Sequence, residues 1–383
     1  MKPIYLDYAA TTPVDPRVKS AMLPYLESDF GNPSSGHRIG QQALEGVEMA
    51  RGKVAALIGA AHNEIIFTSG GTESDNTAIK SACFTQRGHG NHIITSAIEH
   101  HAVLSPCHFL EQQGYTVTYL PVNSEGLIRP EDVKKAITDK TILISIMHAN
   151  NEIGTIQPLK EVGAVAKKNG ILFHTDAVQS AGHIDIDVNE LQLDFLSLSA
   201  HKLYGPKGVG ALYIRNGIPF EPLLHGGGHE KGRRSSTHNV PGIAALGKAA
   251  EIAGAGLTEE SGHVRRLRNQ LWENLQASIS GIHINGSWEH RLPNNLNISI
   301  EHVEGESLLM NLDLDGIAVS TGSACSSDSG APSHVLQALD LAPDLARGSL
   351  RMTLGKMTTE DEIGIVSEKL PEIVERLRSM AAF

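Results

Sequence analysis

The chain has 383 residues, a length that favours two domains over one. Hydrophobic residues make up 40% of it and charged residues 20%, which is typical of soluble globular proteins. The formal net charge is −11, from 43 acidic and 32 basic side chains, and this excess of negative charge argues against direct binding to nucleic acid.

The N-terminal segment MKPIYLDYAATTP lacks the apolar run of a signal peptide. No segment elsewhere approaches the roughly 20 apolar residues that a membrane-spanning helix needs. The three cysteines, Cys83, Cys107 and Cys325, are too few and too widely spaced for a disulfide framework. We therefore expect a cytoplasmic protein without membrane contact, in which one cysteine can act as a working thiol.

From about residue 60 to residue 215, short apolar runs alternate with helix-like segments. Continuous apolar runs are typical of strands buried on both faces of a mainly parallel sheet. The expected strands are Ile65–Thr68, His92–Ser96, Thr116–Leu120, Thr141–Met147, Ile171–Thr175, Phe195–Ser199 and Gly210–Ile214. Helices are expected from near Thr72 and over Leu159–Asn169, where Gly170 provides a C-terminal stop. The alternation predicts an α/β domain.

After Pro241 the pattern changes. An Ala- and Gly-rich stretch leads into Glu259–Ser278, which predicts one long helix. Shorter, half-exposed strands are then expected at Asn295–Ile300, Ile317–Ser320 and Ser349–Leu354. These elements predict a smaller α+β domain formed by residues 1–14 and 259–383, packed on a large domain of residues 15–258, with the active cleft between them.

Polar side chains follow five successive strands of the expected sheet, where open α/β sheets bind their ligands. The segments are Ser69-Gly70-Gly71-Thr72-Glu73, Glu99-His100-His101, Asn150-Asn151-Glu152, His174-Thr175-Asp176 with Gln179, and Ser199-Ala200-His201-Lys202. A Gly-rich turn that opens a helix can hold a phosphate. Five such strand ends in succession indicate a lined pocket.

The Gly-rich turn Ser69–Glu73, called the phosphate turn below, lies in one predicted pocket with a carboxylate and a lysine. This combination suits pyridoxal 5′-phosphate. This cofactor needs a lysine amine for a Schiff base and an acid beside its pyridine nitrogen. Lys202 and Asp176 can fill these two positions. Taken alone, the same residues fit equally well with Asp176 as a helix cap and Lys202 as a solvated loop lysine.

Ten ordered motifs carry a close resemblance to the cysteine desulfurases of the NifS/IscS kind, which are fold-type I pyridoxal-phosphate enzymes related to class-V aminotransferases. The motifs are YLDYAATTP, GNPSS, FTSGGTESDN, EHHAV, NNEIGTIQP, HTDAVQ, SAHKLYGPKGVGALY, GGGHEKGRRSST, STGSACSS and RMTLGKMTTEDE. The resemblance covers essentially the whole chain. It implies the conversion of L-cysteine to L-alanine, with the sulfur passing to an enzyme cysteine.

The resemblance implies a role for each matched residue around the cofactor. Lys202 would carry the cofactor and move protons, Asp176 would pair with the pyridine nitrogen, Gln179 would bond the ring hydroxyl, and His100 would stack on the ring and assist proton transfer. The residues that would hold the phosphate are Gly71, Thr72, Ser199 and His201.

The resemblance also implies how the substrate and a second subunit meet the site. Asn151 and Arg351 would bind the substrate carboxylate, Arg351 through a two-pronged contact that lysine does not reproduce. Thr237 would reach the phosphate of the other subunit, which predicts a homodimer.

Cys325 is the cysteine that the resemblance assigns as sulfur carrier. It lies among small residues in Thr321-Gly322-Ser323-Ala324-Cys325-Ser326-Ser327, whereas Cys83 and Cys107 fall in apolar helical stretches typical of a core. The loop length suggests transfer of the sulfur to acceptor proteins, such as an iron–sulfur scaffold or a thiolation enzyme. Gly330-Ala331 stand where relatives more often have Leu-Glu, and His229 stands where Gln is more usual; no role is assigned to His229.

Two alternatives stay open at this point. One is another pyridoxal-phosphate activity on the same fold, such as a selenocysteine lyase or a related aminotransferase-like enzyme. The other is a catalytically inactive scaffold subunit that binds partners of a sulfur pathway. A metal site is not expected, because the 19 histidines include no cluster with paired ligand spacing.

Overall fold

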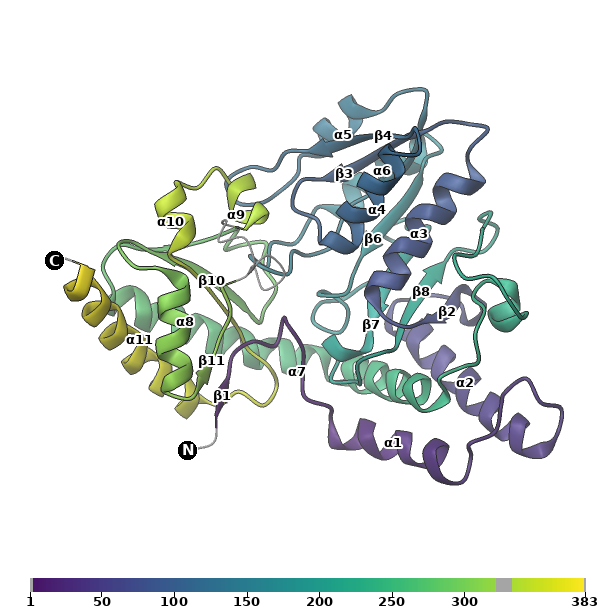
Figure 1. Cartoon of the computed structure of the whole chain (residues 1–383), viewed down its shortest axis with the longest axis horizontal. Coiled ribbons are helices and arrows are strands. Elements are labelled where there is room, and N and C mark those ends of the chain that lie inside the picture. The colour runs from purple at the N-terminus through teal and green to yellow at the C-terminus, as the bar shows by residue number, and fades with distance from the viewer. Residues whose placement is uncertain (1–2, 322–332, 382–383) are drawn as a thin grey trace.

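The computed structural model describes residues 3–321 and 333–381. Its largest sheet has seven strands in the order β2-β8-β7-β6-β5-β3-β4 (Figure 1). The bounds are β2 Ile65–Thr68, β3 His92–Ser96, β4 Thr116–Leu120, β5 Thr141–Ser145, β6 Leu172–Asp176, β7 Phe195–Ser199 and β8 Gly210–Ile214. Five of the seven expected strands coincide with these bounds, and β5 and β6 differ by one or two residues at their ends.

The large sheet is mainly parallel, as expected. Strand β3 pairs in parallel with β4 and β5, and the parallel pairing continues through β5–β6 and β6–β7, whereas β8 runs antiparallel to both β7 and β2. Buried hydrophobic clusters cover both faces, one containing Phe173 and Leu198 and the other containing Ile93 and Phe195. Alternate residues of one strand point to opposite faces, so two-sided burial explains why these strands are continuous apolar runs.

The helices that surround this sheet begin after strand ends or precede the sheet in sequence. Their bounds are α1 Pro16–Glu27, α2 Arg38–Leu57, α3 Gly71–Thr85, α4 His101–Glu111, α5 Pro130–Ala136 and α6 Leu159–Lys168. Gly170 follows α6 with φ +65°, a left-handed conformation that favours glycine and ends the helix. The predicted helix over Leu159–Asn169 and the helix near Thr72 are thus confirmed.

Helix α7 runs from Val240 to Ser278, so the expectation that a helix begins only at Glu259 was wrong. Its first half, including Ala245 and Ala249, packs into the cluster against the large sheet. Its second half, including Leu267 and Leu271, packs into a separate core. Small residues in the first half allow α2 to lie close, since a Cβ at Gly247 would lie 2.5 Å from Ala50 Cα. The composition change after Pro241 therefore reflects a packing requirement of one continuous helix.

The second core is built on a three-stranded antiparallel sheet in the order β12-β10-β9. Beside it, β1 pairs in parallel with β11. The elements are β1 Ile4–Tyr5, β9 Ile282–Ile284, β10 Asn295–Ile300, α8 Gly305–Leu314, β11 Ile317–Ala318, α9 His334–Ala338, α10 Pro343–Arg347, β12 Ser349–Thr353 and α11 Glu360–Ala381.

Strands β10 and β12 are buried at every residue, so the expectation of half-exposed strands was wrong for both. In β10, Asn297 and Ser299 form buried hydrogen bonds with Asn285 instead of facing solvent. The division into a large domain of residues 15–258 and a small one of residues 1–14 and 259–383 stays a prediction, with α7 continuous across its boundary. Among the described helices, none has both the length and the apolar character to cross a membrane.

Candidate active site

A cavity of about 340 Å³ lies at the carboxyl ends of the parallel strands and extends to the second core. Because the strands are parallel, their carboxyl ends meet at one edge of the sheet, and the residues that follow them gather around the cavity. Ten of the twelve predicted site residues line it, namely Gly71, Thr72, His100, Asn151, Asp176, Gln179, Ser199, His201, Lys202 and Arg351. The other two are Thr237, which does not line this cavity, and Cys325, which lies outside the described residues.

The Gly-rich turn between β2 and α3 forms one wall of the cavity. A Cβ at Gly71 would lie 2.6 Å from Val178 Cγ2, so only glycine fits there without displacing a stiff neighbouring side chain. Thr72 follows in the first turn of α3, where backbone N–H groups have no partner within the helix. These donors and the hydroxyl of Thr72 suit an anion such as a phosphate.

Lys202 lies in a short 3-10 turn directly after β7. Its Nζ donates to the carbonyl oxygens of Ala9 and Ala10, at 2.5 and 2.7 Å. Gln179 Nε2 donates to the carbonyl of Ala9 as well, at 3.0 Å. The N-terminal segment therefore lines the cavity with Ala9 and Ala10 and fixes two of the predicted cofactor residues.

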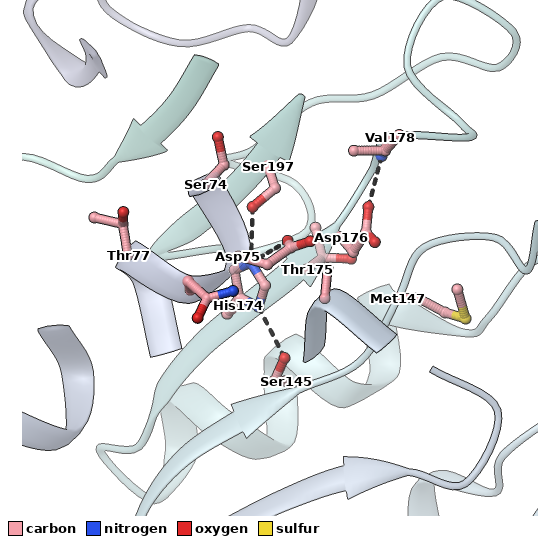
Figure 2. Close-up of polar contacts among 12 residues, drawn as sticks. Ser74, Asp75, Thr77, Ser145, Met147, His174, Thr175, Asp176, Val178 and Ser197 are labelled. Atoms are coloured by element: carbon pink, nitrogen blue, oxygen red, sulfur yellow. Dashed lines mark hydrogen bonds and ion pairs between the residues drawn. The ribbon is translucent and has the colours of Figure 1, made fainter. Parts of the chain in front are cut away.

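Asp176 ends β6 and is buried. Its Oδ1 accepts from the backbone N–H of Val178 at 2.9 Å (Figure 2). Burial, followed by the nearby charge of Asp75, raises the pKa of Asp176 to about 7. A carboxyl that is held in place but short of hydrogen-bond donors is suited to receive a cationic N–H from a bound ligand.

His100 caps the N-terminus of α4, and its Nδ1 accepts from the backbone N–H of Ala102 at 3.1 Å. In the neutral ring the proton therefore lies on Nε2. Burial lowers the pKa of His100, with Asp176 acting in the opposite direction. The neutral imidazole is thus favoured at neutral pH, with one N–H available on the cavity side.

Arg351 lies within β12 and is 3% exposed. Its Nη2 donates to Asp7 Oδ1 at 2.7 Å, and its Nη1 donates to the carbonyl oxygen of Asn151 at 3.1 Å. Its Nε is buried and has no hydrogen-bond partner among the described residues. An arginine with an unsatisfied donor at the wall of a cavity can bind a carboxylate.

Thr237 is exposed and lies in the segment between β8 and α7, which a buried charge cluster fixes in place. Arg51 donates to both carboxylate oxygens of Glu230, at 2.7 and 3.0 Å, and His238 Nε2 lies 2.6 Å from Glu230 Oε1. Glu230 has φ +50°, a left-handed conformation that costs energy for a residue other than glycine and persists only where contacts hold it. Arg234 also ties this segment to the phosphate turn through Glu73, at 2.8 and 3.1 Å.

Sequence reasoning gave no individual role to several residues that line the cavity. Asp75 and Glu152 are buried carboxyls on its wall, and His101 and His334 lie at the same cavity with ring centroids 5.1 Å apart. Ser333 donates to Glu152 Oε2 at 2.5 Å and so fixes the start of α9. Asp75 and Glu152 stand within motifs already read for other residues, and nothing local distinguishes a cavity-facing carboxyl there from a surface one.

Cys83 and Cys107 are fully buried in α3 and α4, within one hydrophobic cluster. Burial raises the pKa of both thiols, that of Cys83 to about 12. A thiol of raised pKa gives little thiolate at neutral pH, so neither cysteine is a good nucleophile. The prediction that both are small core residues is confirmed.

Comparisons with known proteins agree over the whole chain. A model of the aminotransferase class-V family matches residues 4–366. The cysteine desulfurase IscS of Dictyoglomus turgidum is 53% identical over 380 residues, covering 99% of this chain and 96% of that protein.

Two solved structures are similar in fold as well as sequence. A NifS-like protein has a TM-score of 0.92 at 41% identity, covering 98% of this chain and 100% of that one. SspA in complex with cysteine has a TM-score of 0.84 at 40% identity, covering 93% and 100%. The chain therefore belongs to the aminotransferase class-V family and, within it, to the group that contains the IscS cysteine desulfurases.

Proposed function

We propose that this protein is a pyridoxal-phosphate-dependent cysteine desulfurase that converts L-cysteine to L-alanine and takes up the sulfur as a persulfide on Cys325. The observation that carries the proposal is the convergence of Lys202, Asp176 and the phosphate turn in one cavity. The similarity to IscS proteins and to SspA in complex with cysteine supports the choice of substrate.

The cavity fits the cofactor by the chemistry of its donors and acceptors. Gly71, Thr72, Ser199 and His201 would hold the phosphate, Asp176 the pyridine nitrogen and Gln179 the ring hydroxyl. His201 is suited to this position as a neutral ring, since burial and the nearby charge of Lys202 lower its pKa to about 4. When bound, the cofactor supplies a protonated ring that withdraws electrons from the substrate Cα.

The residues of this chain then bind the substrate and move its protons. Arg351 and Asn151 would hold the substrate carboxylate, with Arg351 Nε as a donor that has no partner among the described residues. Lys202, which carries the cofactor before substrate arrives, would take the Cα proton. His100, with its N–H on Nε2, would assist proton transfer near the ring.

Cys325 would complete the reaction. Its thiolate would attack the substrate sulfur, so that a sulfur–sulfur bond forms while the bond between that sulfur and Cβ breaks. Protons return to the carbon skeleton, which leaves as alanine, and the atoms balance as cysteine plus enzyme thiol to alanine plus enzyme persulfide. The persulfide would pass to an acceptor protein, such as an iron–sulfur scaffold or a thiolation enzyme.

We also propose a homodimer in which Thr237 reaches the phosphate of the partner subunit. Two observations support it: Thr237 is exposed, and it does not line the cavity of its own chain. The segment that carries it is nevertheless held rigidly by Glu230 and Arg51. Size-exclusion chromatography with light scattering tests this proposal, and a monomer at micromolar concentration would contradict it. A cytoplasmic location stays a prediction.

Cys325→Ser tests the function. The variant should bind the cofactor and keep its yellow absorbance but form no persulfide and release no sulfide from L-cysteine. Cys107→Ser is the matched control, because Cys107 is buried away from the cavity, and it should keep activity. If Cys325→Ser retained full activity on cysteine, the thiol role would be wrong. Activity on selenocysteine alone would favour a selenocysteine lyase, and failure of wild type to bind the cofactor would favour an inactive scaffold.

A further inference from the structure

A second buried aspartate lies in the wall of the cavity, and no role has been assigned to it. Asp75 lies in α3, one turn after the phosphate turn, and is 1% exposed. Neither of its carboxyl oxygens has a hydrogen-bond partner of ordinary geometry among the described residues. A buried carboxylate without hydrogen bonds is energetically unfavourable. Asp75 should therefore either hold a proton or lie beside a group that supplies one.

His174 is the titratable group next to Asp75. Its Nε2 lies 3.5 Å from Asp75 Oδ1, and Figure 2 shows the two side chains next to each other. His174 is fully buried, with Nδ1 2.8 Å from Ser145 Oγ and Nε2 3.1 Å from Ser197 Oγ. A hydroxyl can donate or accept, so these two serines can accommodate the imidazole in either its neutral or its protonated form without movement of heavy atoms.

Asp75 and His174 can therefore share one proton. A protonated Asp75 beside a neutral His174 has no net charge, and neither has an ionised Asp75 beside a protonated His174. Burial favours such neutral combinations, since an isolated charge in this volume would be unsolvated. Burial raises the pKa of Asp75 to about 7 and lowers that of His174 to about 4, and both shifts favour the uncharged forms.

The position of the pair makes its charge important for Asp176. His174 and Asp176 are two residues apart on β6 and thus point to the same face of the sheet. Asp75 and Asp176 both line the cavity, and two neighbouring carboxyls in one dry volume do not both ionise at neutral pH without cost. Asp176 receives a backbone N–H from Val178, at 2.9 Å, whereas Asp75 receives none, so the negative charge is better placed on Asp176.

The other titratable groups around Asp176 do not change this assignment. Glu99 is buried between β3 and α4, and its carboxyl accepts from the backbone N–H of Met147 at 2.9 and 3.1 Å. Burial raises the pKa of Glu99 to about 8, which favours its protonated form. His100 lines the same cavity, and its nearby charge lowers the pKa of Asp176 and so favours the ionised form.

We propose that Asp75 is a positioning residue that shares a single proton with His174, so that, while the pair holds this proton, the wall of the cavity presents one negative charge, on Asp176, to the cofactor ring. The proposal deepens the proposed function and rests on it, because the ring nitrogen is what Asp176 would meet. The proton shared by Asp75 and His174 is, however, a property of the cofactor-free protein.

The proton is tested first in the cofactor-free protein, by potentiometric titration of wild type and Asp75→Asn. An ordinary aspartate has a pKa of 3.8 and that of Asp75 is raised to about 7. At a pH near 5.5, between these values, wild type and variant should thus carry nearly the same net charge. They should differ by about one charge near pH 9. A difference of one full charge already near pH 5.5 would overturn the proposal, whether or not the protein binds the cofactor.

The effect on the ring is tested in the loaded enzyme, from the pH at which its yellow absorbance is half lost. In wild type, the Asp75–His174 pair would lose its shared proton at raised pH, and the negative charge then left on Asp75 would stabilise the protonated, yellow form of the cofactor. Asp75→Asn removes this charge, so the midpoint should fall by about one pH unit. Thr77→Val is the control, because Thr77 is buried on the same helix and bonds only the carbonyl of Glu73 among the described contacts; its midpoint should not move.

A third variant keeps the test decisive if Asp75→Asn does not fold. Ser197→Ala removes the hydroxyl that lowers the pKa of Asp75, so Asp75 should keep its proton to higher pH. The midpoint of yellow absorbance should then fall in the same direction and by less. Equal midpoints in wild type and in a folded Asp75→Asn or Ser197→Ala variant would refute the link to Asp176. Absence of cofactor binding in wild type would instead refute the proposed function and leave the titration result standing.

Discussion

Arg351 Nη2 lies 2.7 Å from Asp7 Oδ1, although the two residues are 344 positions apart in the chain. The contact keeps the guanidinium from being an isolated buried charge before a ligand arrives. Within residues 3–321 and 333–381, Nε has no partner. The two terminal nitrogens of the arginine are thus held by Asp7 and by the carbonyl of Asn151, while one donor remains available.

Arg351→Lys should therefore weaken cysteine binding more than it slows later steps. A hydrogen bond to a charged group contributes roughly 1.5–3 kcal/mol, which corresponds to an approximately 10- to 100-fold lower kcat/KM, mainly through a raised KM. Steady-state alanine formation measures this effect. Arg347→Lys is the control, because Arg347 is exposed and its ion pair in the described part of the chain is with Asp344 on the same helix; a similar loss there would contradict a specific role of Arg351.

Glu230→Gln should destabilise the protein at neutral pH. Burial alone would raise its pKa, but hydrogen bonds from His238 and Arg51 lower it to about 2. The ionised form thus stabilises the fold above the ordinary glutamate pKa of 4.5, and this contribution is lost as the pH falls from about 4.5 to about 2. Breaking a buried pair costs about 3–5 kcal/mol.

Urea unfolding of wild type and Glu230→Gln at pH 7 and near pH 3 measures this pH dependence, and the difference between the two proteins should shrink in acid. Glu251→Gln, at an exposed pair with Lys248, should cost less than about 1 kcal/mol. A Glu230→Gln effect that did not depend on pH would mean that packing, not charge, holds the segment.

Gly71→Ala should lower the affinity for pyridoxal phosphate at least about tenfold, since the new Cβ would displace either the turn or Val178. The double variant Gly71→Ala/Val178→Ala removes the clashing methyl groups and should regain part of the affinity. Equilibrium titration of the cofactor into cofactor-free protein measures both. Additive losses in the double variant would indicate that the clash with Val178 is not the cause.

Thiol titration of the native protein should leave Cys83 and Cys107 unmodified, because both are fully buried and have a raised pKa. A thiol reagent should label one equivalent per native chain and three in denaturant, matching the three cysteines of the sequence. In Cys325→Ser, the one thiol labelled in the native protein should be lost, whereas the other two should still be labelled in denaturant. Rapid labelling of two or more thiols in the native wild type would argue against burial of the other two.

The strands of the large sheet were predictable because a strand buried on both faces appears in the sequence as a short apolar run bounded by turn residues. The same logic failed for β10, whose Asn297 and Ser299 suggest a solvent-facing side but bond the buried Asn285. It also failed for β12, which is buried at every residue. The start of α7 was missed because its first half is rich in Ala and Gly. Such a composition is found in loops but also in helices that pack closely, as α7 does against α2.

The site was predictable where a residue follows a strand, as Lys202 and Asp176 do. It was not predictable where the partner comes from a distant segment. The pairing of Asp7 with Arg351, and the approach of Asp75 to His174 from a separate helix, depend on tertiary contacts that no local spacing encodes.

The N-terminal segment has a consequence for the order in which the protein matures. Its carbonyl groups at Ala9 and Ala10 hold Lys202, while Asp7 bridges to Thr353 and Ala9 N–H donates to the hydroxyl of Thr353 at 2.8 Å. Ala9 is thus fixed by a strand that the ribosome makes 344 residues later. The large sheet can form during synthesis, but the lysine pocket closes only after β12 has left the exit tunnel, so cofactor capture follows the synthesis of β12.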